Sequence, residues 1–495
     1  MDLRIYQRDG VQMIKAAMRE CKQLSKPQNI MLAAPCAYGK TITAAYILKA
    51  YQDAGKRGLF ICDRIKLVDQ SIDAFRSLGL KFGVIQSHHP LYNPKQPIQI
   101  ASAQSLENFR AWPDSDFIIV DEAHSLRQSV RDQMDKWNNV PFLGLSATPF
   151  SKGLGLYFNR LVVPVTPREL LEQGYLCPVD YYGGSKASLA GVKTKQLSSG
   201  GNDYLDSSLA QAIEKDDVLA GDIVKNWQKH AAGRMTIAFS PSVKHSKHMV
   251  ELFNESGIPA IHIDGYMDRE EQYDIYQAHK DGEFLILSCS RLLNTGYDEP
   301  AVSCLIDCYP TKSIIQYVQR AGRIMRTAEG KPNAIYLDHA GNVSYHGFAE
   351  DIIPDSLDDE TKEYDEKKLT KEKPPAKSKE CPQCAQTMIG IRCKCGYEIP
   401  MREQIETDNQ ELEVLHSVES KDWNKKTTKG DKEQFYGMLR QYAGDKGYSP
   451  GWVAHKYKER SGVWPNAYKG SPKVKADDNF KNYLRHLAIK RARAA

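Results

Sequence analysis

The chain has 495 residues, 41% of them hydrophobic and 26% charged, with 67 Lys and Arg against 62 Asp and Glu. This composition is that of ordinary globular domains and excludes a wholly disordered or collagen-like chain, and the length suffices for two to four domains. No stretch approaches the ~18 uninterrupted apolar residues of a membrane helix, and no apolar segment near Met1 resembles a secretory signal. We therefore expect a cytoplasmic protein with no membrane partner.

Residues 1–165 alternate short apolar runs with helical patterns such as Thr41–Ala54. The runs are Asn29–Ala34, Gly58–Cys62, Pro97–Ala101, Asp116–Val120 and Pro141–Leu145. A second set of runs follows: Met235–Phe239, Ala260–Ile263, Phe284–Ser288, Ser303–Ile306 and Asn333–Leu337. Apolar strands separated by helices are typical of parallel sheets, so we predict two parallel-sheet α/β domains in tandem.

The composition changes after Gly347, where charged and polar stretches surround four clustered cysteines. Stretches of this kind are solvated linkers. From Lys421 onward there are 18 Lys and Arg but 7 Asp and Glu, which suggests that the tail holds a polyanion. We expect six segments: residues 1–165 and 166–347 as α/β domains, with a connector opening the second, 348–380 as a linker, 381–400 as a cysteine module, 401–430 as a linker and 431–495 as a basic, aromatic-rich domain.

The segment from Ala34 to Thr41 joins a predicted strand to a predicted helix and contains Gly39 and Lys40. Such a loop directs backbone N–H groups and a helix N-terminus at a phosphate. Lys40 would reach the β- and γ-phosphates of a nucleotide, and the Thr41 hydroxyl would bind Mg²⁺. The sequence Gly39-Lys40-Thr41 could equally begin an ordinary helix with a surface lysine. A second motif is therefore needed to support a phosphate site.

Asp121 and Glu122 supply that second motif at the end of another predicted strand. Asp121 would hold the metal through water, and Glu122 would orient or deprotonate the attacking water. Because both motifs lie at strand ends of one predicted sheet, together they favour a site for hydrolysis of Mg-ATP.

Four motifs then follow in order: Lys40-Thr41, Asp121-Glu122-Ala123-His124, Ser146-Ala147-Thr148 and Gln319–Arg326. In this order the chain resembles the superfamily 2 helicases of the DEAH-box type, over about residues 1–345. The resemblance implies two RecA-like domains that bind ATP between them and move along nucleic acid. The chain is also similar to RadD-type bacterial and phage repair helicases through Leu3–Gln7, Gly144–Phe150, Asn294–Asp298 and Leu337–Asn342.

This resemblance implies a role for individual residues. It implies nucleotide contacts by Gln7 and Asp298, and catalytic contacts from the second domain by Gln319, Arg323 and Arg326, whose two guanidinium groups would neutralise charge on the γ-phosphoryl. Coupling of hydrolysis to strand movement is implied for His124, Ser146 and Thr148. Contacts with the nucleic acid are implied for Ser102, Gln104, Thr295 and Gly296.

Ala37 departs from the family pattern, which usually has Gly at this place, and Tyr38 stands where the family has a small residue. A left-handed conformation at Ala37 would cost about 1–2 kcal/mol because of its Cβ. We therefore expect either a slightly reshaped loop or modest nucleotide affinity.

Four cysteines form a compact set: Cys381, Cys384, Cys393 and Cys395. Thiolate pairs with this short, ribbon-like spacing predict a structural Zn²⁺ site, and an iron–sulfur cluster is the less favoured alternative. A segment of about 20 residues cannot bury a hydrophobic core large enough to fold without a bound metal ion. We therefore expect a zinc ribbon and no catalytic role for the metal.

The tail interleaves bases with aromatic residues, among them Trp452, Lys456 and Lys458. Cations that meet phosphates beside rings that stack on bases would suit a single-stranded or forked nucleic acid. A small helical domain with an aromatic core and solvated lysines has the same composition, and the two can coexist.

The combined hypothesis is an ATP-dependent DNA helicase or translocase acting on single-stranded, forked or branched DNA in replication, recombination or repair, with ATP, Mg²⁺ and Zn²⁺. Two alternatives stay open: an RNA-remodelling ATPase, and an ATP-switched DNA-binding adaptor that does not unwind. A protein partner from replication or recombination would be compatible with each of these.

Overall fold

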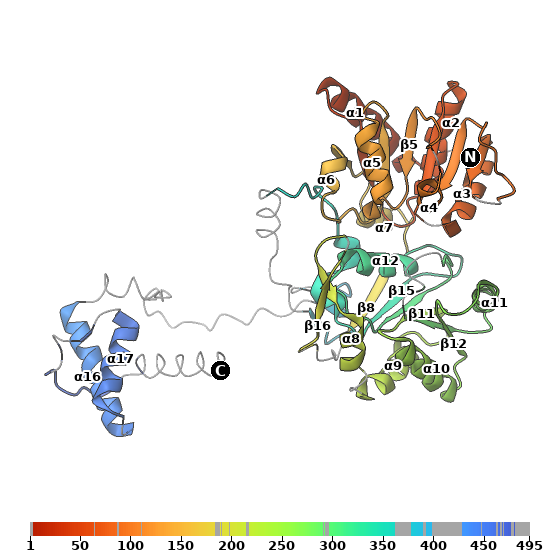
Figure 1. The fold of residues 1–495 in the computed structure, drawn as a ribbon. Helices are drawn as coiled ribbons and strands as arrows, with labels where there is room; N and C mark the ends of the chain where they lie inside the picture. Colours follow the sequence, from red (N-terminus) through yellow and green to blue (C-terminus); the bar gives the residue numbers. More distant parts are fainter. Residues whose placement is uncertain are drawn as a thin grey trace. The chain divides into compact units, whose positions relative to one another are not determined.

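The computed structural model describes two compact units, residues 1–399 and 400–495 (Figure 1). The residues described are 3–361, 378–389, 393–397 and 428–480, without 64, 87–88, 110, 184–188, 190, 198, 214–216, 291, 293–296, 447, 462–463, 466–467, 469 and 477–479. Within this described part of the chain, no helix is both long and apolar enough to cross a membrane.

The first domain is built on a seven-stranded parallel sheet. Its strands, in spatial order, are β3 (Phe82–Ile85), β4 (Ile98–Ser102), β2 (Gly58–Cys62), β5 (Phe117–Val120), β6 (Phe142–Ser146), β1 (Ile30–Ala33) and β7 (Arg160–Val162). Its helices are α1 (Ile5–Gln23), α2 (Lys40–Asp53), α3 (Ile65–Ser77), α4 (Ala103–Glu107), α5 (Gln128–Lys136) and α6 (Leu154–Tyr157).

Helices cover both faces of this sheet, which explains why its strands are apolar throughout. Ile30 and Leu32 of β1 join one buried cluster with α1 and α2, whereas Met31 between them joins the other with α5 and α6. Successive side chains of a strand point to opposite faces, so a strand buried on both sides has no polar alternation.

The second domain has a six-stranded parallel sheet. Its strands, in spatial order, are β12 (Ala260–Ile263), β13 (Ile286–Cys289), β11 (Thr236–Phe239), β14 (Cys304–Asp307), β15 (Ala334–Asp338) and β8 (Val179–Gly183). Its helices are α8 (Asp206–Ile213), α9 (Asp217–His230), α10 (Val243–Glu255), α11 (Arg269–Lys280), α12 (Ile314–Ile324) and α13 (Asn342–His346). The prediction of two parallel-sheet α/β domains in tandem is confirmed.

Short elements connect and extend the two domains. They are α7 (Pro167–Glu172), the hairpin of β9 (Thr194–Gln196) and β10 (Asn202–Tyr204), the 3-10 turns η1 (Ala123–Ser125) and η3 (Ala349–Asp351), and the hairpin of β16 (Ser378–Glu380) and β17 (Thr387–Ile389). The second unit contains α16 (Lys429–Lys446) and α17 (Pro450–Ser461), which pack around a shared cluster that includes Leu439 and Tyr457.

Residues 352–361, which we call the return strap, leave the second domain after η3 and come back to the first. The Gly155 N–H of α6 donates to the Asp358 carbonyl at 2.7 Å, and Lys152 pairs with Glu360 at 3.9 Å. Leu357 packs against the apolar cluster beneath α5 and α6. The chain thus passes from one domain to the other at the connector after β7 and again at the return strap.

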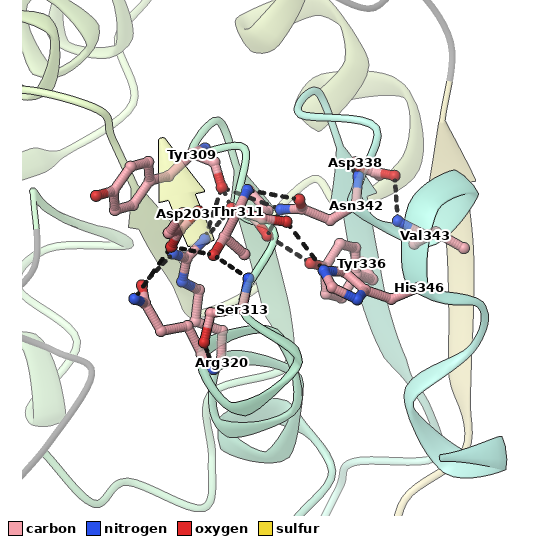
Figure 2. A network of polar contacts seen from close by, with 12 residues as sticks. Asp203, Tyr309, Thr311, Ser313, Arg320, Tyr336, Asp338, Asn342, Val343 and His346 are labelled. Carbon is pink, nitrogen blue, oxygen red and sulfur yellow. Dashed lines mark hydrogen bonds and ion pairs between the residues drawn. The ribbon is translucent and has the colours of Figure 1, made fainter. Parts of the chain in front are cut away.

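Helix α12 is anchored by an ion pair inside the second domain. Arg320 is fully buried, and its guanidinium lies 3.0 Å from the equally buried Asp307 of β14 and donates to the Tyr309 carbonyl at 2.7 Å. Asp307 also accepts hydrogen bonds from Tyr336 at 2.5 Å and from Asn342 at 2.8 Å. Figure 2 shows these side chains converging from α12, β15 and α13. The network therefore fixes where α12 lies on the sheet.

We expect Arg320→Met to destabilise the second domain by about 3–5 kcal/mol, because it leaves the Asp307 carboxylate buried without its cation. Urea unfolding followed by fluorescence would measure the loss. Arg269→Met, at an exposed position of α11, is the matched control. A loss below about 1 kcal/mol, the ordinary value of a surface pair, would contradict a buried anchoring role.

Candidate active site between the two parallel sheets

The loop between β1 and α2 has the backbone shape expected of a phosphate-binding loop. Ala37 has φ +65° and Gly39 has φ +85°, so both are left-handed. The loop is not reshaped at Ala37 and carries the strain of a Cβ in that conformation, about 1–2 kcal/mol. Lys40 and Thr41 form the first turn of α2, where unsatisfied N–H groups and the helix dipole favour a phosphate.

Gln7 and Tyr38 connect this loop to α1. The Gln7 amide donates from Nε2 to the Tyr38 carbonyl at 2.8 Å and accepts from the Arg4 N–H at 2.9 Å. The Tyr38 ring is fully buried, which raises the pKa of its hydroxyl, and a Cβ on Gly10 would lie 2.3 Å from that oxygen. The large residue at position 38 therefore packs beneath the loop and not in the space of a nucleotide. Gln7 lies beside the loop, and its contact with adenine stays a prediction.

Asp121 and Glu122 are held side by side at the end of β5. The Asp121 N–H donates to the Ile61 carbonyl at 2.8 Å, and the Glu122 N–H donates to the Asp121 carboxylate at 3.0 Å. Burial and the neighbouring Glu122 charge raise the pKa of Asp121. Burial opposes ionisation of Glu122 as well, but a hydrogen bond with His124 and the charge of Lys40 outweigh it and lower the pKa of Glu122.

This set of donors fits a nucleotide with a divalent cation. Two adjacent, half-buried carboxyl groups beside Lys40 favour a bound cation, since oxygen ligands and negative charge are what Mg²⁺ prefers. Asp121 and Thr41 would hold the ion, which would draw charge from the phosphates. The lowered pKa keeps Glu122 ionised more readily but also makes it a weaker base, and its role in activating water stays a prediction.

His124 connects these acids to the strand end of β6. Its Nδ1 lies 3.2 Å from Glu122 Oε2 and 3.0 Å from the Ser146 hydroxyl. The Ser146 oxygen in turn accepts from the Thr148 N–H at 3.0 Å, and both Ser146 and Thr148 are fully buried. The residues for which coupling was predicted thus form one continuous chain of contacts.

Helix α12 of the second domain reaches this chain of contacts. Gln319 Nε2 lies 3.3 Å from His124 Nε2. Gly322 faces Cys36 of the phosphate loop so closely that a Cβ would lie 2.4 Å from the sulfur. The sequence analysis did not single out Cys36 or Gly322, although a glycine inside a helix is a signal of close approach. The two domains therefore meet directly at the loop.

Arg323 and Arg326 lie on the same side of α12. Arg323 donates to the Tyr297 carbonyl at 2.5 Å, and burial lowers its pKa while the Glu122 charge opposes that change. Arg326, just beyond the helix, forms an ion pair with Asp298. The contact of Asp298 with nucleotide stays a prediction. The roles of both arginines at the γ-phosphoryl stay predictions.

The residues predicted to contact nucleic acid are placed unevenly. Ser102 is fully buried and caps α4, where its hydroxyl accepts from the Ser105 N–H at 3.0 Å. Gln104 on the same helix is exposed. Thr295 and Gly296 lie outside the described residues. Of the two that the structure describes, Gln104 has the side chain more available to a ligand.

In the C-terminal unit the aromatic residues form a core. Trp452 stacks on Tyr442 at a ring distance of 6.0 Å, and Lys456 is 5% exposed. Lys458 lies over the ring of the half-exposed Trp464 at 4.2 Å. Most of these residues therefore belong to a helical domain with an aromatic core. Of the two lysines, Lys458 is the more accessible to a phosphate.

The four cysteines Cys381, Cys384, Cys393 and Cys395 lie together, with their sulfurs within 4.8 Å of one another. Cys381 and Cys395 are 3.7 Å apart, and Cys384 and Cys393 are 3.6 Å apart. These distances exceed the ~2.05 Å of a disulfide and agree with the ~3.8 Å edge of a tetrahedron with Zn–S bonds of 2.3 Å. The set of donors fits a closed structural zinc site.

Two family models match the chain. That of the type III restriction enzyme res subunit matches residues 1–151, and that of the helicase conserved C-terminal domain matches residues 216–328. The first match contains the phosphate loop and the two acids, and the second contains α12. Both halves of the site described above therefore lie in matched regions.

Individual proteins are similar over most of this chain. A 51.5 kDa protein of a Lactococcus phage (isolate 7-9) is 28% identical, over 78% of this chain and 81% of the phage protein. The Saccharomyces cerevisiae protein IRC3, named as a candidate ATP-dependent helicase, is 24% identical over 68% of this chain and 51% of its own length. The solved structure of LlaBIII, an ATP-dependent type ISP restriction-modification enzyme bound to DNA, has a TM-score of 0.51 at 18% identity and covers 69% of this chain and 28% of LlaBIII.

Proposed function

Because the chain belongs to the superfamily 2 helicases, whose members hydrolyse ATP to drive movement on nucleic acid, we propose that its substrate is forked or branched DNA. In this proposal it unwinds or remodels such DNA during replication, recombination or repair. The observation that carries the proposal is the contact of α12 with the phosphate loop and with His124 of the other domain.

This contact makes hydrolysis depend on the position of two domains. Lys40 binds the phosphates, Glu122 accepts the proton of the attacking water, and Arg323 stabilises the charge that develops on the γ-phosphoryl. Gln319 touches His124, which in turn contacts Glu122, so a shift of α12 would reach Glu122 through His124. A strand held across both domains would move as they close and reopen.

The comparisons support DNA over RNA, whereas the charge of the C-terminal unit suits the backbone of either. The family model that matches the first domain is described for a restriction enzyme subunit, and LlaBIII is described as bound to DNA. Basic residues outnumber acidic ones in the C-terminal unit, and Lys458 with Trp464 offers a cation and a half-exposed ring. We propose that this unit adds affinity for the DNA backbone.

The test is the steady-state ATPase rate with no nucleic acid, single-stranded DNA, duplex DNA, forked DNA and single-stranded RNA. We expect forked or single-stranded DNA to raise the rate about tenfold or more, and RNA to raise it little. A fork of the same sequence in which one strand is RNA is the control, because it differs from the DNA fork only in the 2′-hydroxyls of that strand.

Other outcomes would contradict particular parts of the proposal. Preferential stimulation by RNA would make the protein an RNA-remodelling ATPase. Stimulation by DNA without strand displacement or fork regression would make it a switch that uses ATP to change a binding state.

A further inference from the structure

The second cysteine pair has a lysine between its two metal ligands. Lys394 lies between Cys393 and Cys395, and its ammonium group donates to the Val179 carbonyl of β8 at 3.0 Å and to Glu350 Oε1 at 2.8 Å. A loop of the cysteine module therefore places the ammonium group of the half-exposed Lys394 against the second domain.

The place that receives Lys394 is a built polar and aromatic site. Glu350 is 3% exposed, and its other oxygen accepts from the Tyr181 hydroxyl at 2.7 Å. The ammonium lies 5.4 Å from the Tyr181 ring centroid and 5.2 Å from that of Phe348. A carboxylate this buried needs a cation, and two aromatic faces add to the attraction.

The rest of the module also lies against the second domain. Strand β17 packs beside β8, the edge strand of the six-stranded sheet. A Cβ on Gly183 at the end of β8 would lie 3.1 Å from the Thr387 hydroxyl. An exposed edge is a liability that proteins often cover, and here the cysteine module lies beside it.

Glu350 belongs to η3, and η3 lies against α12. Tyr317 of α12 donates to the Gly347 carbonyl at 2.7 Å, and its ring contacts Tyr336, which contacts Tyr181. Ala349 and Ile352 line the same apolar cavity as residues of α12. A path of direct contacts therefore runs from Lys394 to the helix that carries Gln319 and Arg323.

We propose that Lys394 is a positioning residue: the metal-organised loop holds it in the Tyr181–Phe348–Glu350 site and thereby fixes η3 and α12 for ATP hydrolysis. The kinetic part of this proposal rests on the proposed function. The structural part does not, because it concerns the order of α12 in the absence of nucleotide.

The experiment compares four full-length variants with the wild type. They are Lys394→Ala, Lys394→Arg, Glu350→Gln, which removes the charge from the receiving side, and Gln383→Ala, an exposed position between the first two cysteines. Three quantities are measured: zinc per chain, hydrogen exchange of residues 314–324 and 349–351, and kcat and KM for ATP.

We expect Lys394→Ala to keep one zinc per chain and to exchange faster in both segments. We expect kcat to fall roughly 10- to 100-fold with KM for ATP nearly unchanged, because a small displacement of a catalytic group acts mainly on the transition state. Glu350→Gln should behave alike, Lys394→Arg should recover part of kcat, and Gln383→Ala should match the wild type.

Unchanged exchange of α12 in Lys394→Ala would overturn the proposal and make the module an independent appendage. Loss of zinc in that variant would also overturn it, since the lysine would then support the metal site itself. Absence of ATPase activity in the wild type would refute the proposed function, while the exchange data would still decide the structural part.

Discussion

Replacing Lys40 with alanine is expected to lower ATP turnover by about 10²–10³-fold or more while leaving the fold and nucleic-acid binding intact. Lys40 opens α2 and its charge acts on both Asp121 and Glu122. We expect this ammonium group, which lies near both acids, to bind the phosphates of the nucleotide. Steady-state ATPase assays and fluorescence anisotropy with labelled DNA would measure the two effects.

Lys49→Ala provides the matched control, because Lys49 lies on the same helix and pairs with Asp53 at its surface. That variant should keep the wild-type rate. Retained turnover in Lys40→Ala would overturn the assignment of the phosphate loop, and loss of folding would show as a change in the thermal transition.

Replacing Glu122 with glutamine is expected to lower hydrolysis about 10²–10⁴-fold while ATP still binds. Glutamine keeps the shape of the side chain but cannot accept the proton, and Lys40 and the helix N-terminus still bind the phosphates. Single-turnover hydrolysis and equilibrium binding of a fluorescent ATP analogue separate the two steps. Glu107→Gln at the end of α4, a part-exposed position, is the control.

A Glu122→Gln variant that hydrolyses ATP at the wild-type rate would exclude this carboxylate as the base. A variant that no longer binds the analogue would indicate that Glu122 supports the site and not the chemistry.

The sheets could be predicted because their strands are apolar on both faces. The predicted run Gly58–Cys62 coincides with β2, and Met235–Phe239 overlaps β11. Strand β8 was missed within the connector because its sequence, Val-Asp-Tyr-Tyr-Gly, mixes buried and half-buried positions, as the edge of a sheet allows. Strand β7 was missed because it has only three residues.

The residues of the site could be predicted from the sequence, but most of the contacts between them could not. Neighbours in sequence, such as Asp121 and Glu122, had to be adjacent in space. The meeting of Gly322 with Cys36 depends on how two domains pack, which no local pattern encodes. Arg320 is the first of three arginines spaced three residues apart and is fully buried, because its partner Asp307 lies on another element.

The return strap has a mechanical consequence for the motor. The connector joins the two domains covalently, and the strap, which extends from the second domain, docks on the first through a hydrogen bond and an ion pair. A body attached at two points keeps one easy rotation, about the line through them, and loses free swivelling and sliding. Each closure would then be guided by one covalent link, the connector, and by one non-covalent link, the docked strap, before any strand is bound.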